Sequence, residues 1–502
     1  MAAVTEWSAP GGSWHFVALA NWITGAPLSS VQPIAVRDIG YPLFIVLLGK
    51  HPGAVLVAQF VMAALLPVLV YWQIARFDCA IAWAAGCLVM LSLAPYQFAG
   101  WLHHDQLFIF MFTLSCALTL WVLERPSYMR ALLVAATWLI TSLSRPAANL
   151  SGLLCLALLV LLVHTHRRAI VTGALVLLLA LIGYGRWRSR AIAREGGVDY
   201  AGSQLFFTAY VLGGQEGLNL HTVGGPEIEE ISSRLGTAAQ QLVAREPEPV
   251  SWLNAYGFTA DTERIAFPPE VFHKGAPSKQ MVDFMFAHPT DDYYEFINFA
   301  VNDYALLGRA AMLSFRRHPL TYVAIGVSRS GMLVWKPGVV SGRLLDPRAP
   351  QAERQNLSFY FLDRNTADPQ LALMPASYRT AFGPNRPNAL KAFVRRTAMR
   401  LQLARLWAIA DEWTSKALLL LFVAGLAVAT RKAQTALMKT LLVIALPHFT
   451  IIGITGLIVG ADYRYHFMSV PEAVVLGSLG LWALLAPSLN SAPRAAGPSR
   501  TL

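Results

Sequence analysis

Nine apolar runs of membrane length constrain the fold of this chain more than any other feature of its sequence. Each run is close to the ~20 residues that an α-helix needs to cross the hydrocarbon core of a bilayer. Hydrophobic residues make up 55% of the chain and charged residues 14%, whereas ordinary soluble domains carry about 25% charged residues. The sequence therefore predicts an all-α polytopic membrane protein with about nine or ten transmembrane helices. The predicted spans are 53–75, 79–96, 105–123, 130–145, 148–164, 169–186, 413–430, 436–459 and 467–487.

A long polar region separates the first six predicted spans from the last three. It divides the chain into an N-terminal part with an outer loop and membrane helices (1–186), the polar region itself (187–410), a second set of membrane helices (411–487) and a tail (488–502). The tail is rich in Ala, Pro, Ser and Arg, which predicts disorder.

The polar region contains helical patterns of its own. Amphipathic helices are predicted near 226–245 and 291–315, the second with acidic residues at its N-terminus. An apolar stretch near 320–336 is interrupted by Arg329. That interruption favours a helix lying at the membrane interface over one that crosses it.

Basic residues in the short loops predict how the helices are oriented. Lys and Arg are enriched in cytoplasmic loops, which assigns to that side the loops with Arg76, Glu124–Arg130, His166–Arg168 and Arg431–Lys432. The intervening loops and the polar region then lie outside. Residues 1–40 would also lie outside without a preceding span or signal peptide, and the favoured interpretation is that an upstream helix is missing from the reading frame.

The formal net charge of +11 does not indicate a nucleic-acid partner. The basic residues fall in short loops and in the polar region, so they fit membrane topology and phosphate-bearing lipids better.

Ionisable residues collect at the helix ends that this orientation places outside. Such groups are costly at membrane depth, so they indicate function by default. Guanidinium groups bind phosphate through bidentate hydrogen bonds, and a carboxylate can act as base for an incoming hydroxyl. The set predicts a site for a phosphorylated lipid, and its members are Arg37, Asp38, His103, His104, Asp105, Arg145, Arg186–Arg190 and Asp462–His466.

These residues also have structural interpretations. Asp105 could be the N-cap of the following helix, and Arg37 and Asp38 could form a local surface ion pair. Arg145 could extend to the membrane interface, and Arg464, between two tyrosines, could anchor an aromatic belt.

A metal site receives little support from the sequence. The four cysteines lie in apolar runs and show neither metal-ligand spacing nor a disulfide pattern. His103 and His104 could bind a metal or a phosphate group. Adjacent residues point in different directions on a helix, however, so a shared metal site is not expected.

Four stretches occur in a suggestive order along the chain: Arg37–Phe44 with its Gly-Tyr-Pro, His104–Phe108 with an acid opening a helix, Leu143–Pro146 with Ser-Arg-Pro, and Asp462–Pro471. In this order they resemble the GT-C class of integral-membrane glycosyltransferases, which includes bacterial relatives of the dolichyl-phosphate-mannose protein mannosyltransferases. The resemblance implies a sugar donor on a polyprenyl phosphate, an outward-facing active site and inverting transfer.

The N-terminus departs from that family. The resemblance implies a transmembrane helix followed by an outer loop whose acidic residue serves as base or metal ligand. Gly12 stands where this acid is expected, and no span precedes it. These departures leave three interpretations open: a misplaced start codon, an inactive relative, or a base that has moved to Asp38 or Asp105.

The resulting hypothesis assigns catalysis to Asp38 and Asp105. The predicted substrate-binding residues are Arg37, Tyr41, His104, Arg145, Tyr463, Arg464, Tyr465 and His466. No residue is assigned to a metal, although the resemblance leaves a divalent metal ion open. The expected partners are a polyprenyl-phosphate sugar donor, an extracytoplasmic acceptor (lipid, glycan or protein) and membrane lipids. The expected location is a bacterial inner membrane, with the active site facing the periplasm or exterior.

Two other functional classes are alternatives to this hypothesis. O-antigen polymerases and ligases also combine many spans with a long outer loop, but they lack the Gly-Tyr-Pro and Arg-Tyr-x-x-Pro elements. Transporters tend to show inverted repeats, and the two halves of this chain do not match.

Overall fold

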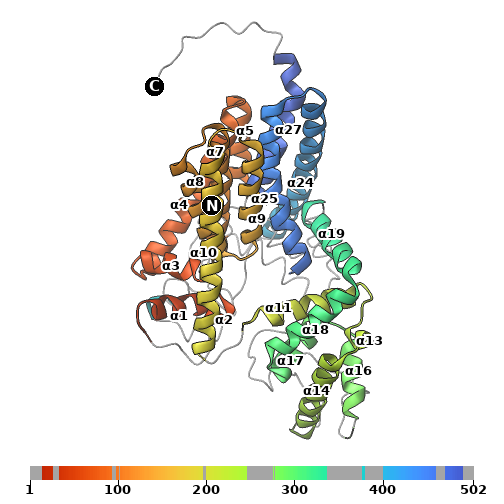
Figure 1. The fold of residues 1–502 in the computed structure, drawn as a ribbon. Coiled ribbons are helices and arrows are strands. Elements are labelled where there is room, and N and C mark those ends of the chain that lie inside the picture. Colours follow the sequence, from red (N-terminus) through yellow and green to blue (C-terminus); the bar gives the residue numbers. More distant parts are fainter. Residues whose placement is uncertain are drawn as a thin grey trace.

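The computed structural model describes residues 14–26, 33–92, 98–100, 102–195, 199–245, 275, 277–335, 376–378, 399–458 and 470–489. Over these residues the chain is helical and contains no strand (Figure 1). A bundle of long helices forms one part, and a smaller helical body lies beyond one of its ends.

Nine apolar helices of the described residues coincide with the nine predicted spans, which confirms an all-α polytopic membrane protein. Five are long and apolar enough to cross a membrane: α4 (Pro52–Ala75), α7 (Asp105–Glu124), α10 (Arg167–Arg194), α24 (Met399–Arg431, apolar over Ala410–Arg431) and α25 (Thr435–Ile458). The other four apolar helices are α5 (Cys79–Leu91), α8 (Tyr128–Ser144), α9 (Ala148–Leu162) and α27 (Val470–Leu489).

Helix ends differ from the predicted span ends by more than three residues in three places. α10 continues to Arg194, α24 already begins at Met399, and α5 ends at Leu91. Hydropathy marks only the apolar part of a helix, whereas Arg, Ala and Leu favour helix on either side of that part. The basic segment after residue 186 is therefore the end of α10.

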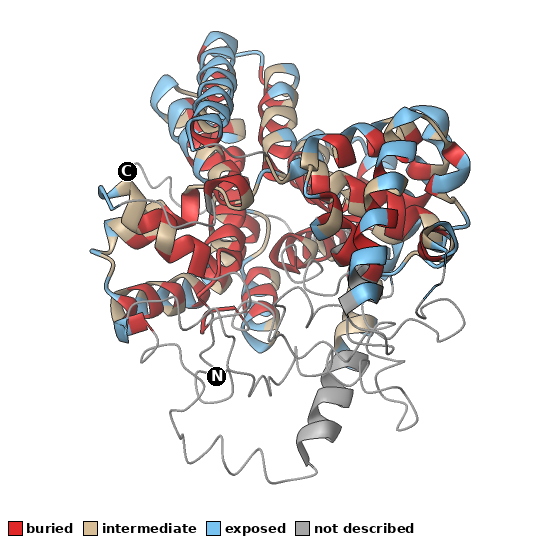
Figure 2. Cartoon of the chain, turned by 90° about the horizontal axis from the view of Figure 1, so that it is seen from below, coloured by how far each residue is buried: buried red, intermediate tan, exposed pale blue. Residues whose placement is uncertain are grey.

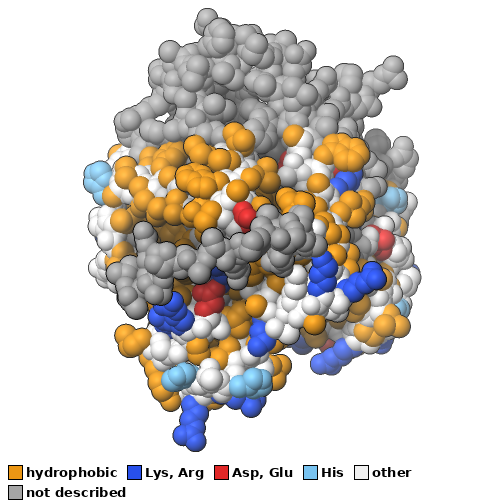
Figure 3. Space-filling model, turned by 90° about the horizontal axis from the view of Figure 1, so that it is seen from above, with side chains coloured by type: hydrophobic (Ala, Val, Ile, Leu, Met, Phe, Trp, Pro, Cys, Tyr) orange, Lys and Arg blue, Asp and Glu red, His pale blue; other side chains and the backbone are white. Residues whose placement is uncertain are grey.

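The ends of these helices lie at two opposite ends of the bundle. Arg76, which follows α4, pairs with Glu124 at the end of α7. Lys439 near the start of α25 donates to the Leu162 carbonyl at the end of α9, at 3.2 Å. These contacts place the loops predicted to be basic at one end of the bundle, where Lys and Arg side chains stand among apolar ones (Figure 3).

The opposite end of the bundle carries three short helices, α1 (Trp14–Ile23), α2 (Pro33–Val36) and α3 (Gly40–Leu47), together with the helical body (Figure 1). The starts of α4, α7, α9 and α27 meet the ends of α8, α10 and α25 on this side. Every described segment that the loop charges predict to be outside thus lies beside the same bundle end.

Helices α24 and α27 cross closely because glycines line their contact. A Cβ atom on Gly480 would lie 2.1 Å from the Leu421 carbonyl oxygen, and one on Gly425 would lie 2.2 Å from the Gly480 Cα. Small residues at such crossings let two backbones approach within van der Waals contact, which drives helix association in lipid.

The helical body has its own core, separate from that of the bundle (Figure 2). Phe206, Tyr210, Ile231 and Phe286 are among its fully buried side chains. The body consists of α11 (Ala201–Phe207), a π-helical turn (Thr208–Leu212), α12 (Gly213–Gln215), α13 (Leu220–Val223), α14 (Pro226–Arg245), α16 (Ser278–Ala287), α17 (Asp291–Val301), α18 (Tyr304–Arg317) and α19 (Pro319–Trp335).

The helix predicted near 226–245 is confirmed as α14, but the single helix predicted over 291–315 is wrong. The chain breaks at Asn302, which adopts a left-handed conformation with φ of 45°. The Asp303 side chain then caps α18 by accepting from the Leu306 N–H at 2.9 Å. The cap of α17 is Thr290, whose hydroxyl accepts from the Tyr293 N–H at 3.2 Å, and not an acidic residue.

α19 occupies the stretch for which an interfacial helix is predicted, and it joins the body to the bundle. It packs along α25, with the Ser330 hydroxyl 3.3 Å from the Ile452 carbonyl oxygen. Arg329 does not face α25. Its guanidinium donates to the Gln215 side chain at 2.8 Å and lies 3.9 Å from the Glu216 carboxylate. The body therefore supplies the polar partners of the one charge on this helix.

Candidate active site

The cluster formed by His103, His104, Asp105 and Arg145 lies at the bundle end that faces α1–α3 and the body. Residues 102–104 are not helical, and α7 begins at Asp105. The N-cap position belongs to His104, and no side chain caps the helix. The N-cap interpretation of Asp105 is thus not confirmed, and its fully buried carboxylate is directed to other side chains.

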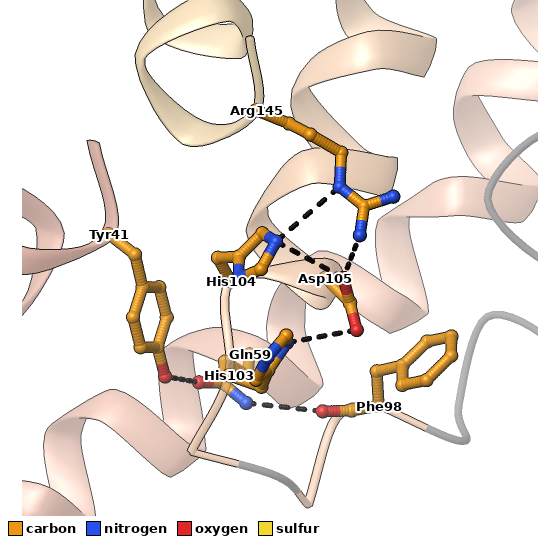
Figure 4. A network of polar contacts seen from close by, with 7 residues as sticks. All are labelled: Tyr41, Gln59, Phe98, His103, His104, Asp105 and Arg145. Carbon is orange, nitrogen blue, oxygen red and sulfur yellow. Dashed lines mark hydrogen bonds and ion pairs between the residues drawn. The ribbon is translucent and has the colours of Figure 1, made fainter. Parts of the chain in front are cut away.

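Three cationic or imidazole groups surround the Asp105 carboxylate (Figure 4). His103 Nδ1 lies 2.9 Å from Oδ2. Arg145 Nη2 and His104 Nε2 lie 3.3 Å and 3.5 Å from Oδ1. A buried carboxylate is costly unless it is paired and hydrogen-bonded, and the contacts with His103 and Arg145 provide that compensation.

Arg145 reaches Asp105 because α8 ends at the right place. Arg145 is the C-cap of α8, and Pro146 follows it. α3 packs against this helix end through Gly40, where an added Cβ would lie 2.5 Å from the Leu143 carbonyl carbon and 2.6 Å from the Ser144 nitrogen. Only a glycine fits such an approach, so the Gly-Tyr-Pro and Ser-Arg-Pro stretches are two sides of one contact.

Tyr41 is connected to the site through a chain of hydrogen bonds. The side chain is fully buried, and its hydroxyl donates to Gln59 Oε1 at 2.5 Å. The Gln59 amide in turn donates to the carbonyl oxygens of Phe98 and Ala99, at 3.3 Å and 3.0 Å. Tyr41, predicted to bind substrate, therefore positions the segment that leads to His103.

Phe16 of α1 is an aromatic centre that sequence reasoning missed. Its ring lies 5.1 Å from the Tyr41 ring, 5.5 Å from His103 and 5.4 Å from His104, measured between centroids. The Arg37 guanidinium lies 5.4 Å from the centre of the same ring. The aromatic run Trp14-His15-Phe16 was a usable signal, because a ring can hold both imidazole edges and a cation.

Arg37 and Asp38 diverge although they are adjacent. Arg37 turns toward Phe16 and the histidines. Asp38 accepts a hydrogen bond from the Tyr184 hydroxyl at 2.9 Å and lies 3.8 Å from Arg188 Nε, both on α10. Burial raises the pKa of Asp38, and the nearby Arg188 and the Tyr184 hydroxyl partly offset that rise.

Arg188 completes this second cluster. It also donates to the Ala35 carbonyl oxygen at 3.0 Å and pairs with Asp199 at 2.7 Å. The loop between α2 and α3 is thereby fixed to the extended end of α10. Sequence reasoning noted Arg186–Arg190 as a basic segment, but only Arg188 of its three arginines is partly buried, and Arg186 and Arg190 are exposed.

His104 is held in its neutral form. Burial lowers the pKa of His104 well below the ordinary value. The neighbouring His103, Arg145 and Arg37 lower this pKa further, against the Asp105 carboxylate, which raises it. Its Nε2 accepts from Arg145 Nε at 3.4 Å, so the ring proton resides on Nδ1. The neutral imidazole of His104 therefore accepts a hydrogen bond from the Arg145 cation. The two side chains do not repel each other as two positive charges would.

The His103–His104–Asp105 group could also hold a metal ion. One ligand atom from each residue lies within 4.8 Å of the others, and imidazole with carboxylate is a donor set that Zn²⁺ accepts. The expectation that the two rings diverge is wrong: their centroids lie 4.2 Å apart, because both residues precede the helix. The Arg145 guanidinium beside the same carboxylate opposes a cation there.

Several predicted residues lie outside the described residues. These are Asp462 and the predicted substrate-binding residues Tyr463, Arg464, Tyr465 and His466. The remaining predictions separate into one cluster around Asp105 (Arg37, His104, Arg145), the support formed by Tyr41, and the cluster around Asp38.

Comparison with known proteins adds no relative to this picture. No family model, no curated protein and no solved structure matches the chain.

Proposed function

We propose that the protein is a membrane glycosyltransferase that moves a sugar from a polyprenyl phosphate to an extracytoplasmic acceptor. The observation that carries this proposal is the Asp105 carboxylate, buried between two imidazoles and Arg145 at one end of a membrane bundle. Buried ionisable groups at membrane depth are functional by default. A carboxylate next to arginines supplies both a proton acceptor and a binding site for phosphate.

In this mechanism the acceptor hydroxyl oxygen forms a bond to the anomeric carbon, and the bond from that carbon to the phosphate oxygen breaks, with inversion. The hydroxyl proton passes to the Asp105–His103 pair. The electron pair leaves with the phosphate, and Arg145 and Arg37 stabilise its charge. Arg464 and its neighbours remain proposed phosphate ligands on the strength of the family resemblance.

Asp105 is preferred to Asp38 as the base. Both partners of Asp38 lie on α10 and tie a loop to that helix. The partners of Asp105 come from three places: the segment before α7, the end of α8 and, through Phe16, α1. Convergence of several elements on one buried acid is what an active site requires.

The proposal includes a location. The active site would face the periplasm or exterior of a bacterial inner membrane, because the basic loops gather at the other end of the bundle. Membrane lipids would surround the bundle, and the helical body beside the site would meet the acceptor.

The test uses the full chain in lipid nanodiscs with a panel of undecaprenyl-phosphate sugars, and measures release of undecaprenyl phosphate. Wild-type protein should consume at least one donor, and Asp105→Asn should slow it by about 10²–10⁴-fold. Asp78→Asn is the matched control. Asp78 caps α5 at the other bundle end, and asparagine caps a helix equally well.

Three outcomes would reject the proposal. Consumption of an undecaprenyl-diphosphate oligosaccharide alone would identify a polymerase or ligase. Failure to consume any donor would identify an inactive relative. Equal rates for Asp105→Asn and Asp78→Asn would remove Asp105 from the chemistry.

A further inference from the structure

A polar groove lies between α14 and α16 on the helical body, and the proposed chemistry does not use it. Its volume is about 590 Å³, within the roughly 300–1,000 Å³ that small-molecule sites occupy. Both helices lie at the end of the body farther from the bundle (Figure 1). The lining consists mainly of hydroxyl, amide and charged side chains: Glu229, Ser232, Ser233, Thr237, Gln240 and, from α16, Ser278, Lys279 and Asp283.

α14 has two distinct faces. Ile228, Ile231 and Leu235 are buried in the core of the body. The face that lines the groove instead presents hydroxyl and amide groups at a helical spacing of three to four residues. Gly236 lies between these groups, where a Cβ would meet Ser278 at 3.4 Å. The two helices thus touch at Gly236 and leave polar side chains on both walls.

The polar groups of the groove are not fully paired within the protein. The Ser232 hydroxyl oxygen is buried and has no hydrogen-bond partner among the described residues. His221 Nε2 lies 3.2 Å from Asp283 Oδ1, and its ring stacks on Phe286 with centroids 5.4 Å apart. A buried hydroxyl without a partner costs free energy, so this side chain is suited to a ligand that can both donate and accept.

The charged, apolar and hydroxyl groups of the groove indicate which class of ligand it can bind. The carboxylates of Glu229 and Asp283 outnumber the ammonium of Lys279, which disfavours phosphate and other anions. Ile228 and Val282 are the only branched aliphatic side chains of the described lining, which disfavours a lipid chain. Alternating hydroxyls and C–H surfaces fit a neutral sugar, whose hydroxyls each donate and accept.

We propose that this groove binds neutral saccharide units of a glycan acceptor. The inference rests on the proposed transferase function and adds the acceptor class to it. Because the groove is remote from Asp105, it would hold sugar units distant from the reacting hydroxyl. Such a second contact raises the effective concentration of the acceptor end at the active site. It would lower the KM for long acceptors and leave the KM for short ones unchanged.

The test measures glycan binding directly. Full-length protein in nanodiscs is applied to a printed array of neutral and anionic bacterial mono- to hexasaccharides. Ser233→Trp fills the groove, since Ser233 is exposed on its wall. Arg309→Trp, exposed on α18 outside the groove, is the matched control for adding an indole to this body. We expect wild type and Arg309→Trp to retain neutral oligosaccharides and Ser233→Trp to bind them at least about tenfold more weakly.

The readout separates this inference from the proposed chemistry. Asp105→Asn should bind the same saccharides as wild type, because it changes transfer only. Loss of transfer with retained array binding in that variant supports both proposals. The inference is overturned if no neutral saccharide is retained by wild type, if only anionic ones are, or if Ser233→Trp binds as well as Arg309→Trp. None of these results would bear on donor consumption in the panel assay.

Discussion

The two carboxylates predicted as alternative bases lie in different environments. Asp105 is fully buried at the start of α7, among His103, His104 and Arg145. Asp38 keeps 16% of its side chain exposed, and both its partners belong to α10. One acid joins several helices into a polar centre, and the other fastens a loop. The proposed preference for Asp105 as the base therefore rests on its partners and not on its position in the sequence.

The largest difference should appear when each acid loses its arginine. Arg145→Leu leaves the Asp105 carboxylate buried without its cation, which typically costs about 3–5 kcal/mol. Arg188→Leu removes partly exposed ion pairs with Asp38 and Asp199, each of which contributes about 0–1 kcal/mol. It also removes the hydrogen bond to the Ala35 carbonyl. Thermal unfolding of both variants in nanodiscs measures the contrast.

A second variant checks the cause of that loss. Asp105→Asn combined with Arg145→Leu removes the uncompensated charge and should recover most of the stability lost by Arg145→Leu alone. Equal losses in Arg145→Leu and Arg188→Leu, or no recovery in the double variant, would contradict the contrast between the two acids.

The next effect tests how Arg145 is positioned. Gly40→Ala places a Cβ 2.5 Å from the Leu143 backbone, so α3 and the end of α8 must separate. Overpacking of this kind costs about 1–3 kcal/mol, and the displaced Arg145 should weaken donor turnover. Gly183→Ala on α10 is the control, because nothing lies within 4 Å of its added Cβ. A Gly40→Ala variant as stable and active as Gly183→Ala would refute the role of this contact.

A smaller effect concerns the Asp38 cluster. Tyr184→Phe removes the 2.9 Å hydrogen bond to Asp38, and a typical hydrogen bond contributes about 0.5–1.5 kcal/mol to stability. Because this cluster fastens a loop, the stability should fall by that amount while the donor KM and the pH profile of turnover stay unchanged. A changed pH profile would return Asp38 to the list of candidate bases.

The membrane helices could be predicted from the sequence because apolar length is a direct physical requirement of the bilayer. The full length of α10 could not, since the arginines after residue 186 continue this helix beyond its apolar part. The break at Asn302 was missed because a left-handed residue inside an amphipathic pattern leaves the pattern intact. The spacing of apolar residues predicts where a helix lies, but it does not show where that helix is interrupted.

The candidate site could be predicted to a similar extent. The charges of the loops correctly predicted that Arg37, His104, Asp105 and Arg145 lie at the same end of the bundle. The attachment of Asp38 to Tyr184 depends on where α10 passes the loop after α2. No pattern within residues 37–44 contains that information. The predicted span already begins at residue 105, but hydropathy does not give the conformation of the residues before it. The arrangement of the His103 and His104 rings depends on that conformation.

The smallest effect concerns the pH dependence that Asp38 adds to stability. Burial raises its folded-state pKa above the 3.8 of an unperturbed aspartate, so between these two values the folded chain binds more protons than the unfolded chain. The free energy of unfolding then decreases as the pH rises through this window, and the stability that protonated Asp38 contributes is complete only below pH 3.8. Asp38→Asn removes this titration and keeps an oxygen that can accept from Tyr184. The variant should therefore gain stability relative to wild type as the pH rises from 3.8 through the raised folded-state pKa of Asp38, which unfolding curves at successive pH values would measure. Parallel curves for the two proteins would mean that Asp38 ionises as freely in the fold as in the unfolded chain, and the contrast with the buried Asp105 would then rest on their partners alone.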